Sequence, residues 1–176
     1  VALRKLQQEL LPARFPDRRV LGVVIPTAEE IAGFTKTGRV GLMATEATIG
    51  SGVYDEEVYK INKDIKIYGK ACPLLVPIIE AGEADWEGLD LAIGKYADKL
   101  FIQSDKIDTI ILGCTHYAII EGKIRQFLGE SVGLVSQGPI VALKLKSYLQ
   151  RHPEIDKNIE KRGERVFFST ENSVRV

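Results

Sequence analysis

The residues best suited to chemistry in this sequence are Cys114 and His116, two positions apart in the tetrapeptide Gly-Cys-Thr-His. A thiolate is a strong nucleophile, and an imidazole exchanges protons near neutral pH. The tetrapeptide lies between an apolar run that predicts a strand and a pattern that predicts a helix. The start of that helix directs N–H groups and partial positive charge at Cys114, which favours the thiolate. A buried cysteine that acts as a small hydrophobe is the alternative, and the residues alone leave both open.

A second group of polar residues occupies positions 45–52, which are rich in Thr, Ser and Gly. Thr45 and Thr48 would present hydroxyl and N–H groups suited to a carboxylate or a phosphate. The alternative, which the residues by themselves favour, is that these threonines cap the next helix. The loop is not a phosphate-binding P-loop, because no Gly-Lys-Thr/Ser follows it. The sequence also lacks the Gly-x-Gly-x-x-Gly pattern of dinucleotide sites.

The remaining candidates have ordinary structural interpretations. Cys72 precedes Pro73 at a predicted strand end, and we interpret it as a buried structural cysteine. Glu80 is a solvated carboxylate by default, and His152 is expected at the surface. Thr115 offers a hydroxyl at a helix N-terminus, a natural site for a carboxylate. A metal site is not expected, since the cysteines have no Cys-x-x-Cys spacing and a fourth ligand is missing.

Strand and helix patterns alternate along the chain. The predicted strands cover residues 20–25, 40–44, 65–68 (an edge strand), 108–112, 132–135 and 166–168. The predicted helices cover residues 3–11, 27–36 with Thr27 as N-cap, 53–60, 74–79, 86–103, 117–128 and 139–149. This order favours a parallel sheet covered on both faces. Ligands bind such sheets at the carboxyl ends of the strands, which selects residues 45–52, 71–73, 113–117 and 136–138.

Composition excludes several classes of function. Lys+Arg and Asp+Glu both number 24, so a net charge of zero gives no footprint for nucleic acid or an anionic membrane. The longest apolar runs are too short to span a bilayer, and no secretory signal opens the sequence. Two cysteines make a disulfide framework unlikely and favour a reducing cytoplasm. The sequence opens at Val1 inside a helical pattern without a capping residue, so we expect an upstream part to be missing.

Three motifs in this order resemble glutamate racemases, of the aspartate/glutamate racemase superfamily. They are Thr-Glu-x-Thr-Ile from Thr45, Ala-Cys-Pro-Leu-x-Val-Pro-x-x-Glu from Ala71, and Leu-Gly-Cys-Thr-His-Tyr from Leu112. The resemblance covers residue 3 to about residue 153. Ala118 departs from the proline common in the family, and Ser-Gln-Gly at 136–138 departs from a frequent Asp-Ser-Gly.

The resemblance implies cofactor-independent interconversion of L- and D-glutamate, which supplies D-glutamate for peptidoglycan. In this family two cysteines on opposite faces of the substrate exchange the α-proton, as inversion requires. The resemblance makes Cys114 one of them, with His116 assisting it and Glu80 orienting His116. It assigns Thr115 to the substrate backbone, and Thr45 and Thr48 to the α-carboxylate region.

The resemblance also implies an α/β parallel-sheet fold of two pseudo-symmetric domains. Residues 26–135 would form one complete three-layer domain, residues 1–25 a remnant of the N-terminal domain, and residues 136–176 a segment that returns to it. The family's other cysteine lies upstream of such a segment, so we expect these 176 residues alone to be inactive. Glutamate is the expected partner, without nucleic acid or membrane, and a homodimer stays open. The alternatives are aspartate racemase or another superfamily member, and a non-catalytic domain that binds a small anion or a protein.

Overall fold

The computed structural model describes residues 2–166 of the 176-residue chain. By its internal contacts the chain divides into two units, residues 1–143 and residues 144–176. The first unit contains the sheet and all six residues predicted to act in the site. The domain boundaries at residues 25 and 135 remain a prediction.

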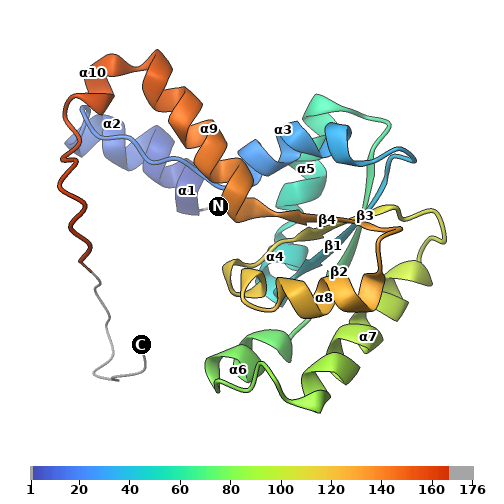
Figure 1. Cartoon of the computed structure of the whole chain (residues 1–176). Coiled ribbons are helices and arrows are strands. Elements are labelled where there is room, and N and C mark those ends of the chain that lie inside the picture. The colour runs from blue at the N-terminus through green and yellow to red at the C-terminus, as the bar shows by residue number, and fades with distance from the viewer. Residues whose placement is uncertain (1, 167–176) are drawn as a thin grey trace. The chain divides into compact units, whose positions relative to one another are not determined.

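A four-stranded parallel sheet forms the centre of the first unit (Figure 1). Its strands are β1 (Arg39–Ala44), β2 (Lys66–Ala71), β3 (Thr109–Leu112) and β4 (Gly133–Ser136), in the order β2-β1-β3-β4. The parallel α/β class predicted from the sequence is confirmed, and so is the edge position of β2. The parallel registers bring the carboxyl ends of all four strands to one edge of the sheet.

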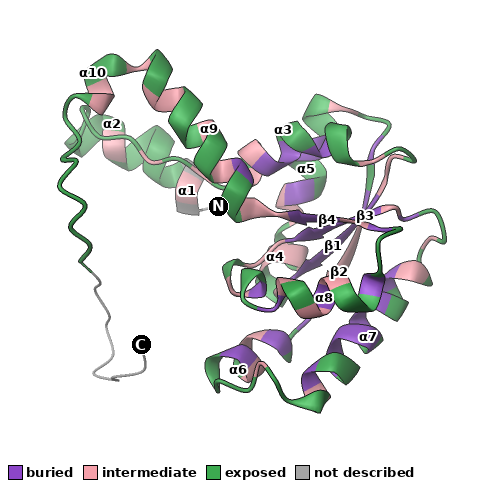
Figure 2. Cartoon of the chain, viewed as in Figure 1, coloured by how far each residue is buried: buried purple, intermediate pink, exposed green. Residues whose placement is uncertain are grey.

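Two apolar clusters pack against opposite faces of the sheet, as the purple core in Figure 2 shows. One cluster joins alternate β1 residues, among them Val40 and Leu42, to α3 (Val24–Phe34) and α5 (Val53–Ile61). The other contains Met43 and joins the sheet to three further helices. These are α6 (Leu75–Glu80), α7 (Glu87–Phe101) and α8 (Glu121–Leu128). The alternation along β1 places a hydrophobic layer on each face, which is why the parallel sheet carries helices on both sides.

The amino end of β3 is fixed by a carboxylate. Asp108 accepts hydrogen bonds from the Thr35 hydroxyl at 2.6 Å and from the main-chain N–H groups of Lys36 and Thr37 at 2.7 and 2.8 Å. Partial burial by itself raises the pKa of Asp108, but these hydrogen bonds outweigh it and lower the pKa to about 2. The ionised carboxylate thus ties the loop before β1 to the start of β3.

The strand predicted at residues 20–25 is wrong. Residues 19–22 have no regular structure, and α3 begins at Val24, with Pro26 in its first turn. A β-branched run needs a neighbouring strand to form a ladder, and none of the four strands pairs with it. Proline is tolerated in a first helical turn, where its missing N–H leaves no bond unmade. Thr27 is therefore not an N-cap: it lies buried within α3, and its hydroxyl donates to the Val23 carbonyl oxygen at 3.0 Å.

Helix boundaries also differ from the sequence prediction at three places. The first helical stretch continues past Pro12 to Arg14 as α1 (Ala2–Lys5), a π-helical turn (Leu6–Leu10) and α2 (Leu11–Arg14). The helix predicted at 117–128 is a 3-10 turn, η2 (Thr115–Ala118), followed by α8. Residues 167 and 168 of the predicted last strand lie outside the described residues. The other predicted strands and helices are confirmed to within a few residues at each end.

The remaining helices are short or cross the boundary between the units. They are α4 (Glu46–Ser51), α9 (Gln137–Arg151) and α10 (Pro153–Asp156). His152 is partly exposed, and its ring lies 4.3 Å from that of Tyr148, centroid to centroid. Within residues 2–166 none of the helices combines the length and hydrophobicity that a bilayer crossing requires.

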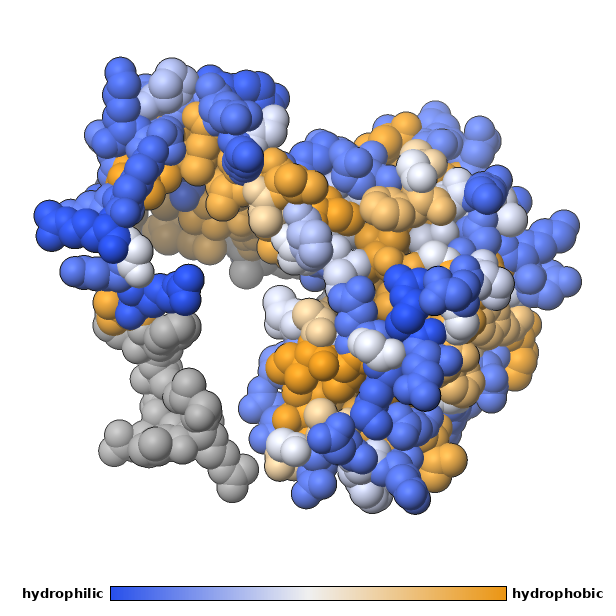
Figure 3. Space-filling view, in the orientation of Figure 1, coloured by the Kyte–Doolittle hydropathy of each residue, from blue (hydrophilic) through white to orange (hydrophobic). Residues whose placement is uncertain are grey.

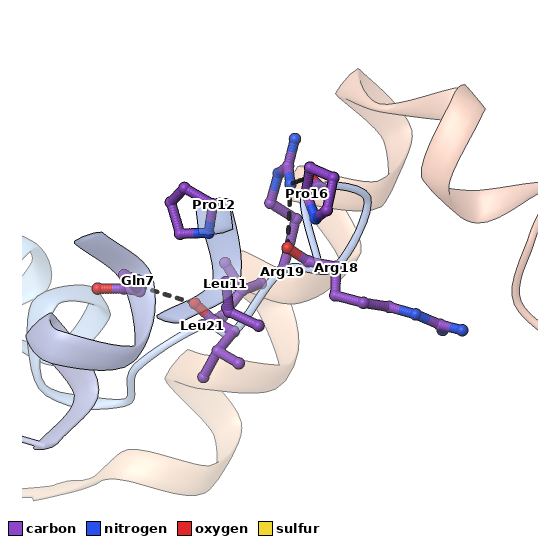
Figure 4. A pocket seen from close by; sticks show the side chains of 8 residues that line it. Gln7, Leu11, Pro12, Pro16, Arg18, Arg19 and Leu21 are labelled. Carbon is purple, nitrogen blue, oxygen red and sulfur yellow. Dashed lines mark hydrogen bonds between the residues drawn. The ribbon is translucent and has the colours of Figure 1, made fainter. Parts of the chain in front are cut away.

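Hydrophobic side chains also reach the surface, as the orange areas of Figure 3 show. Six of the exposed large apolar residues belong to the first 25 positions: Leu6, Leu10, Phe15, Leu21, Val23 and Ile25. This segment also holds a cavity of about 470 Å³, which Leu11, Pro12 and the two arginines Arg18 and Arg19 help to line (Figure 4). Arg19 donates to the main-chain carbonyl oxygens of Pro16 and Arg18, so its guanidinium is already engaged there. The cavity contains none of the predicted site residues.

Candidate active site

The turn after β3 carries the predicted thiol. Gly113 is needed at its first position, because a Cβ there would lie 2.7 Å from the Leu42 Cδ1 atom and 3.0 Å from the Ala44 Cβ atom of the adjacent strand. Cys114 then adopts an extended conformation before η2 begins. Its side chain is partly exposed at the carboxyl edge of the sheet. Glycine therefore suits this position, because a larger residue would have to displace the Leu42 side chain and crowd Ala44.

An imidazole lies beside this thiol. The Cys114 Sγ atom is 3.8 Å from the Nδ1 atom of His116, within the range of a hydrogen bond to sulfur. The Nε2 atom of the same ring contacts the Oε1 atom of Glu80, at the end of α6. A proton on Nε2 that is donated to Glu80 leaves Nδ1 as the acceptor for the thiol. The structure thus brings Cys114, His116 and Glu80 together as a hydrogen-bonded triad, through which a proton can leave the sulfur and return to it.

The His116 and Glu80 side chains of this triad are open to solvent rather than buried. The His116 side chain is 32% exposed and that of Glu80 is 64% exposed. Even a fully charged pair at this exposure contributes little to folding, with a median of about 0–1 kcal/mol. The contact between these two side chains is therefore better suited to orienting an imidazole than to stabilising the fold.

A cavity of about 390 Å³ opens beside Cys114. Cys114 and Thr115 line it from the β3 end, and Ser136 and Gln137 line it from the β4 end. Apolar side chains complete its wall: Val23, Leu112, Ala118, Val141 and Ala142. A small polar molecule held there would meet the thiol of Cys114 and the hydroxyls of Thr115 and Ser136.

Thr45 and Thr48 do not line this cavity. The Thr45 hydroxyl accepts a hydrogen bond from the Thr48 main-chain N–H at 3.3 Å and caps α4, and the two hydroxyls are 3.1 Å apart. This is the capping arrangement that the residue types by themselves favour. Both residues nevertheless lie at the carboxyl end of β1, the strand between β2 and β3. A substrate-binding role for them remains a prediction.

Cys72, at the end of β2, is confirmed as a buried residue with 1% exposure. Its thiol donates to the Lys70 carbonyl oxygen at 3.3 Å. Burial raises the pKa of Cys72 to about 12, and the smaller opposing effects of a main-chain hydrogen bond and of the Lys70 charge do not offset it. At neutral pH this sulfur is a protonated thiol without access to a substrate.

Three contacts near the site were not anticipated. The Ser136 hydroxyl donates to the Glu121 carboxylate at 2.6 Å, and the Gln137 side-chain amide contacts the Tyr54 hydroxyl. The buried hydroxyl of Tyr117 donates to the Cys72 carbonyl oxygen at 3.3 Å. Periodicity cannot reveal such contacts, because the partners lie 15 to 83 positions apart. The one available signal was the position of Tyr117, directly after His116.

Among residues 2–166, no group of three or more His, Cys, Asp and Glu side chains is placed to hold a metal ion.

Comparison with known proteins gives a consistent picture. The chain is 38% identical over 154 residues to a glutamate racemase of Sulfurihydrogenibium sp., an alignment that covers 88% of this chain and 55% of that protein. The crystal structure of a glutamate racemase isoform from Bacillus anthracis matches 86% of the chain and 57% of its own, with a TM-score of 0.70 and 30% identity.

A second solved structure, glutamate racemase from Francisella tularensis in complex with D-glutamate, matches with a TM-score of 0.64 and 31% identity. That match covers 74% of this chain and 47% of the other. No family model matches the sequence. The chain spans about half the length of the relatives it matches.

Proposed function

This chain belongs to the glutamate racemase family, and we propose that it supplies one of the two acid/base centres that interconvert L- and D-glutamate. The observation that carries the proposal is the hydrogen-bonded triad of Cys114, His116 and Glu80 beside a cavity at the carboxyl edge of the sheet. Ligands of parallel α/β sheets bind at this edge. The relative from Francisella tularensis, solved with D-glutamate, supports the choice of substrate.

In the proposed reaction Cys114 removes or returns the α-proton on one face of glutamate. The thiolate is the base, and the thiol is the acid when the reaction runs in the other direction. His116 faces the sulfur through Nδ1, so it can take up the thiol proton and give it back. Glu80 holds the opposite side of the ring and fixes its tautomer and orientation.

We propose that hydroxyl groups hold the substrate. The Thr115 hydroxyl borders the cavity together with Cys114 and suits the polar backbone of an amino acid. Thr45 and Thr48 present hydroxyls at the end of the neighbouring β1 strand, and we assign them to the α-carboxylate region. The apolar part of the wall, with Leu112 and Ala118, excludes water and leaves room for methylene groups.

Inversion requires a second acid/base group on the opposite face of the substrate. The chain has two cysteines, and Cys72 is buried with a raised pKa, so it does not meet this requirement. We therefore propose that the second group comes from a part of the racemase fold other than these 176 residues. The same reasoning leads us to expect that the 176-residue chain alone does not racemise glutamate.

The proposal extends to organisation and setting. Residues 26–135 would be one complete domain, flanked by segments 1–25 and 136–176 that belong to a second one. The reaction would provide D-glutamate for peptidoglycan in the cytoplasm, with a homodimer as the assembly to test first. The support for these points is the similarity to glutamate racemases along most of the chain.

A chimeric racemase tests the proposed activity. The stretch of the Sulfurihydrogenibium relative that matches this chain is replaced by the chain itself, and circular dichroism follows the optical activity of D- and L-glutamate. We expect loss of optical activity with both enantiomers of glutamate and none with aspartate. The 176-residue chain alone serves as the control and should leave both amino acids unchanged. A folded chimera that racemises aspartate and not glutamate would contradict the substrate assignment.

A further inference from the structure

The turn from β2 to α6 is held by two buried tyrosines from other elements. The Tyr117 hydroxyl, from η2, donates to the Cys72 carbonyl oxygen at 3.3 Å. The Tyr96 hydroxyl, from α7, accepts from the Leu74 main-chain N–H at 3.3 Å. The turn itself is closed by the Leu75 N–H, which donates to the same Cys72 carbonyl at 3.3 Å. These contacts fix the first residues of α6 from two sides.

Tyr117 connects two elements that meet at the site. It directly follows His116 in η2, and the carbonyl it binds begins the turn that leads into α6. Helix α6 has six residues, and Glu80 is the last of them. The hydrogen bond from Tyr117 therefore joins the segment that carries the imidazole to the segment that carries its carboxylate partner.

The Tyr117 hydroxyl is built to donate a hydrogen bond and not to titrate. The side chain is fully buried, and burial raises its pKa well above that of an ordinary tyrosine. The hydroxyl therefore stays protonated at neutral pH. Its proton has an acceptor in the Cys72 carbonyl, which accounts for a polar atom in an otherwise apolar cluster.

The exposed pair at the site cannot hold itself in place. The contact between His116 and Glu80 involves side chains that are 32% and 64% exposed, and such pairs are weak in water. Their geometry must come from the backbone segments that bear them. Tyr117 is the buried side chain that bridges those two segments through a hydrogen bond.

We infer that Tyr117 is a positioning residue: through its hydrogen bond to the Cys72 carbonyl it sets the distance between His116 and Glu80, and thereby the protonation behaviour of the Cys114 thiol. The inference rests on the proposed function for the roles of Cys114, His116 and Glu80. It adds a fourth residue, which does not line the cavity. Cys72 then contributes through its main-chain carbonyl, which accepts the hydrogen bond from Tyr117, while its thiol packs in the core.

The test is the pH profile of iodoacetamide alkylation at Cys114 in the full 176-residue chain, followed by peptide mass spectrometry. The variants are Glu80→Gln, Tyr117→Phe and the double variant. We expect both single variants to move the midpoint in the same direction, by about half a pH unit or more, which is roughly threefold in rate below the midpoint. The double variant should match Glu80→Gln, because two changes that act through one contact are not additive.

Tyr54→Phe is the matched control. Tyr54 is a buried tyrosine on the opposite face of the sheet, with a hydroxyl in contact with Gln137. Tyr54→Phe loses the same atom and, with it, the hydrogen bond that its hydroxyl accepts from the Gln137 amide, but it should leave the alkylation midpoint at the wild-type value. If Tyr117→Phe does not fold, Tyr96→Phe loosens the same turn from its other side and should move the midpoint in the same direction.

The outcomes separate this inference from the proposed function. A profile of Tyr117→Phe that superimposes on wild type, while Glu80→Gln shifts, would overturn the positioning role and leave the proposed site intact. Additive shifts in the double variant would also overturn it. If Glu80→Gln leaves the alkylation profile unchanged, Glu80 does not act on Cys114 through His116. The proposed triad is then wrong, and the inference about Tyr117 fails with it.

Discussion

The two cysteines occupy equivalent places in the fold and have opposite environments. Cys72 follows β2 and Cys114 follows β3, the two strands that flank β1 in the parallel sheet. Cys72 is 1% exposed, and its thiol donates to a main-chain carbonyl. Cys114 is partly exposed and faces the Nδ1 atom of His116 at 3.8 Å. Position at a strand end therefore does not decide whether a thiol is reactive.

What differs is the chain that follows each cysteine. After Cys72 the chain turns at once into α6, and the Tyr117 hydroxyl donates to the Cys72 carbonyl oxygen within that turn. After Cys114 a single 3-10 turn follows, and the space beside it is a cavity. The Cys72 residue is thus closed off from solvent, whereas Cys114 borders the cavity. Burial, and not topology, therefore separates the core thiol of Cys72 from the accessible thiol of Cys114.

Alkylation rates should show the largest difference between the two cysteines. A thiol with a pKa of about 12 is thiolate in about one molecule of 10⁴ at pH 8, and burial also blocks the reagent. We expect iodoacetamide to modify Cys114 at least about 1000 times faster than Cys72 in the native chain, as measured by peptide mass spectrometry. In concentrated urea the two rates should converge. Equal rates in the native state would remove the contrast.

Replacing His116 should make Cys114 less distinct from an ordinary cysteine. Asparagine keeps a polar side chain but cannot take up the thiol proton. We expect His116→Asn to slow alkylation of Cys114 at neutral pH by about 10-fold or more, since thiol reactivity follows the thiolate fraction. His152→Asn, on the second unit, should have no effect on this rate. An unchanged rate in His116→Asn would show that the imidazole does not act on the sulfur.

For the free energy of unfolding, replacing Cys72 should matter more than replacing Cys114. Cys72→Ala removes a fully buried sulfur from a packed cluster, which should lower the free energy of unfolding by about 1–2 kcal/mol. Cys114→Ala removes a partly exposed one, and a change within about 0.5 kcal/mol is expected. Urea denaturation followed by circular dichroism measures both. A larger loss for Cys114→Ala would mean that Cys114 has a packing role that its exposure conceals.

The smallest expected effect concerns the other end of β3, where Asp108 is fully satisfied by hydrogen bonds. Its pKa is lowered to about 2, below the ordinary value of about 3.9, so the ionised form stabilises the folded state above pH 4. That contribution should disappear as the pH falls from about 4 to about 2. With solvent screening it is on the order of 1 kcal/mol. Urea midpoints at pH 5 and pH 2.5 should differ less in Asp108→Asn than in wild type, and an equal difference would contradict this.

The sequence predicted the sheet well because its strands are short apolar runs bounded by polar residues. Residues 109–112 are all buried, as expected for a short apolar run in a parallel sheet that is covered on both faces. The run at 20–25 was misassigned because β-branched residues there also fit the start of a helix. Propensity cannot separate these outcomes when no neighbouring strand is available.

The site was predictable in part. The resemblance of the motifs implied that Glu80 orients His116, and the structure brings their side chains into contact. The support from Tyr117 and the contact between Gln137 and Tyr54 were not predicted, because they depend on how separate elements pack. The loop of Thr45 and Thr48 shows the opposite limit: its residue types fit both a helix cap and a carboxylate site, and the structure displays the cap.

The most direct test of the central claim compares the two cysteines in the chimeric racemase. Racemisation of D-glutamate is followed by circular dichroism for Cys114→Ser and for Cys72→Ser, in chimeras whose helical signals match that of the parent. We expect Cys114→Ser to lower kcat by about 100-fold or more, since a serine hydroxyl is a far weaker acid/base group. Cys72→Ser should stay within a few-fold of the parent. Full activity in Cys114→Ser, or an equal loss in Cys72→Ser, would contradict the assignment of the reactive thiol.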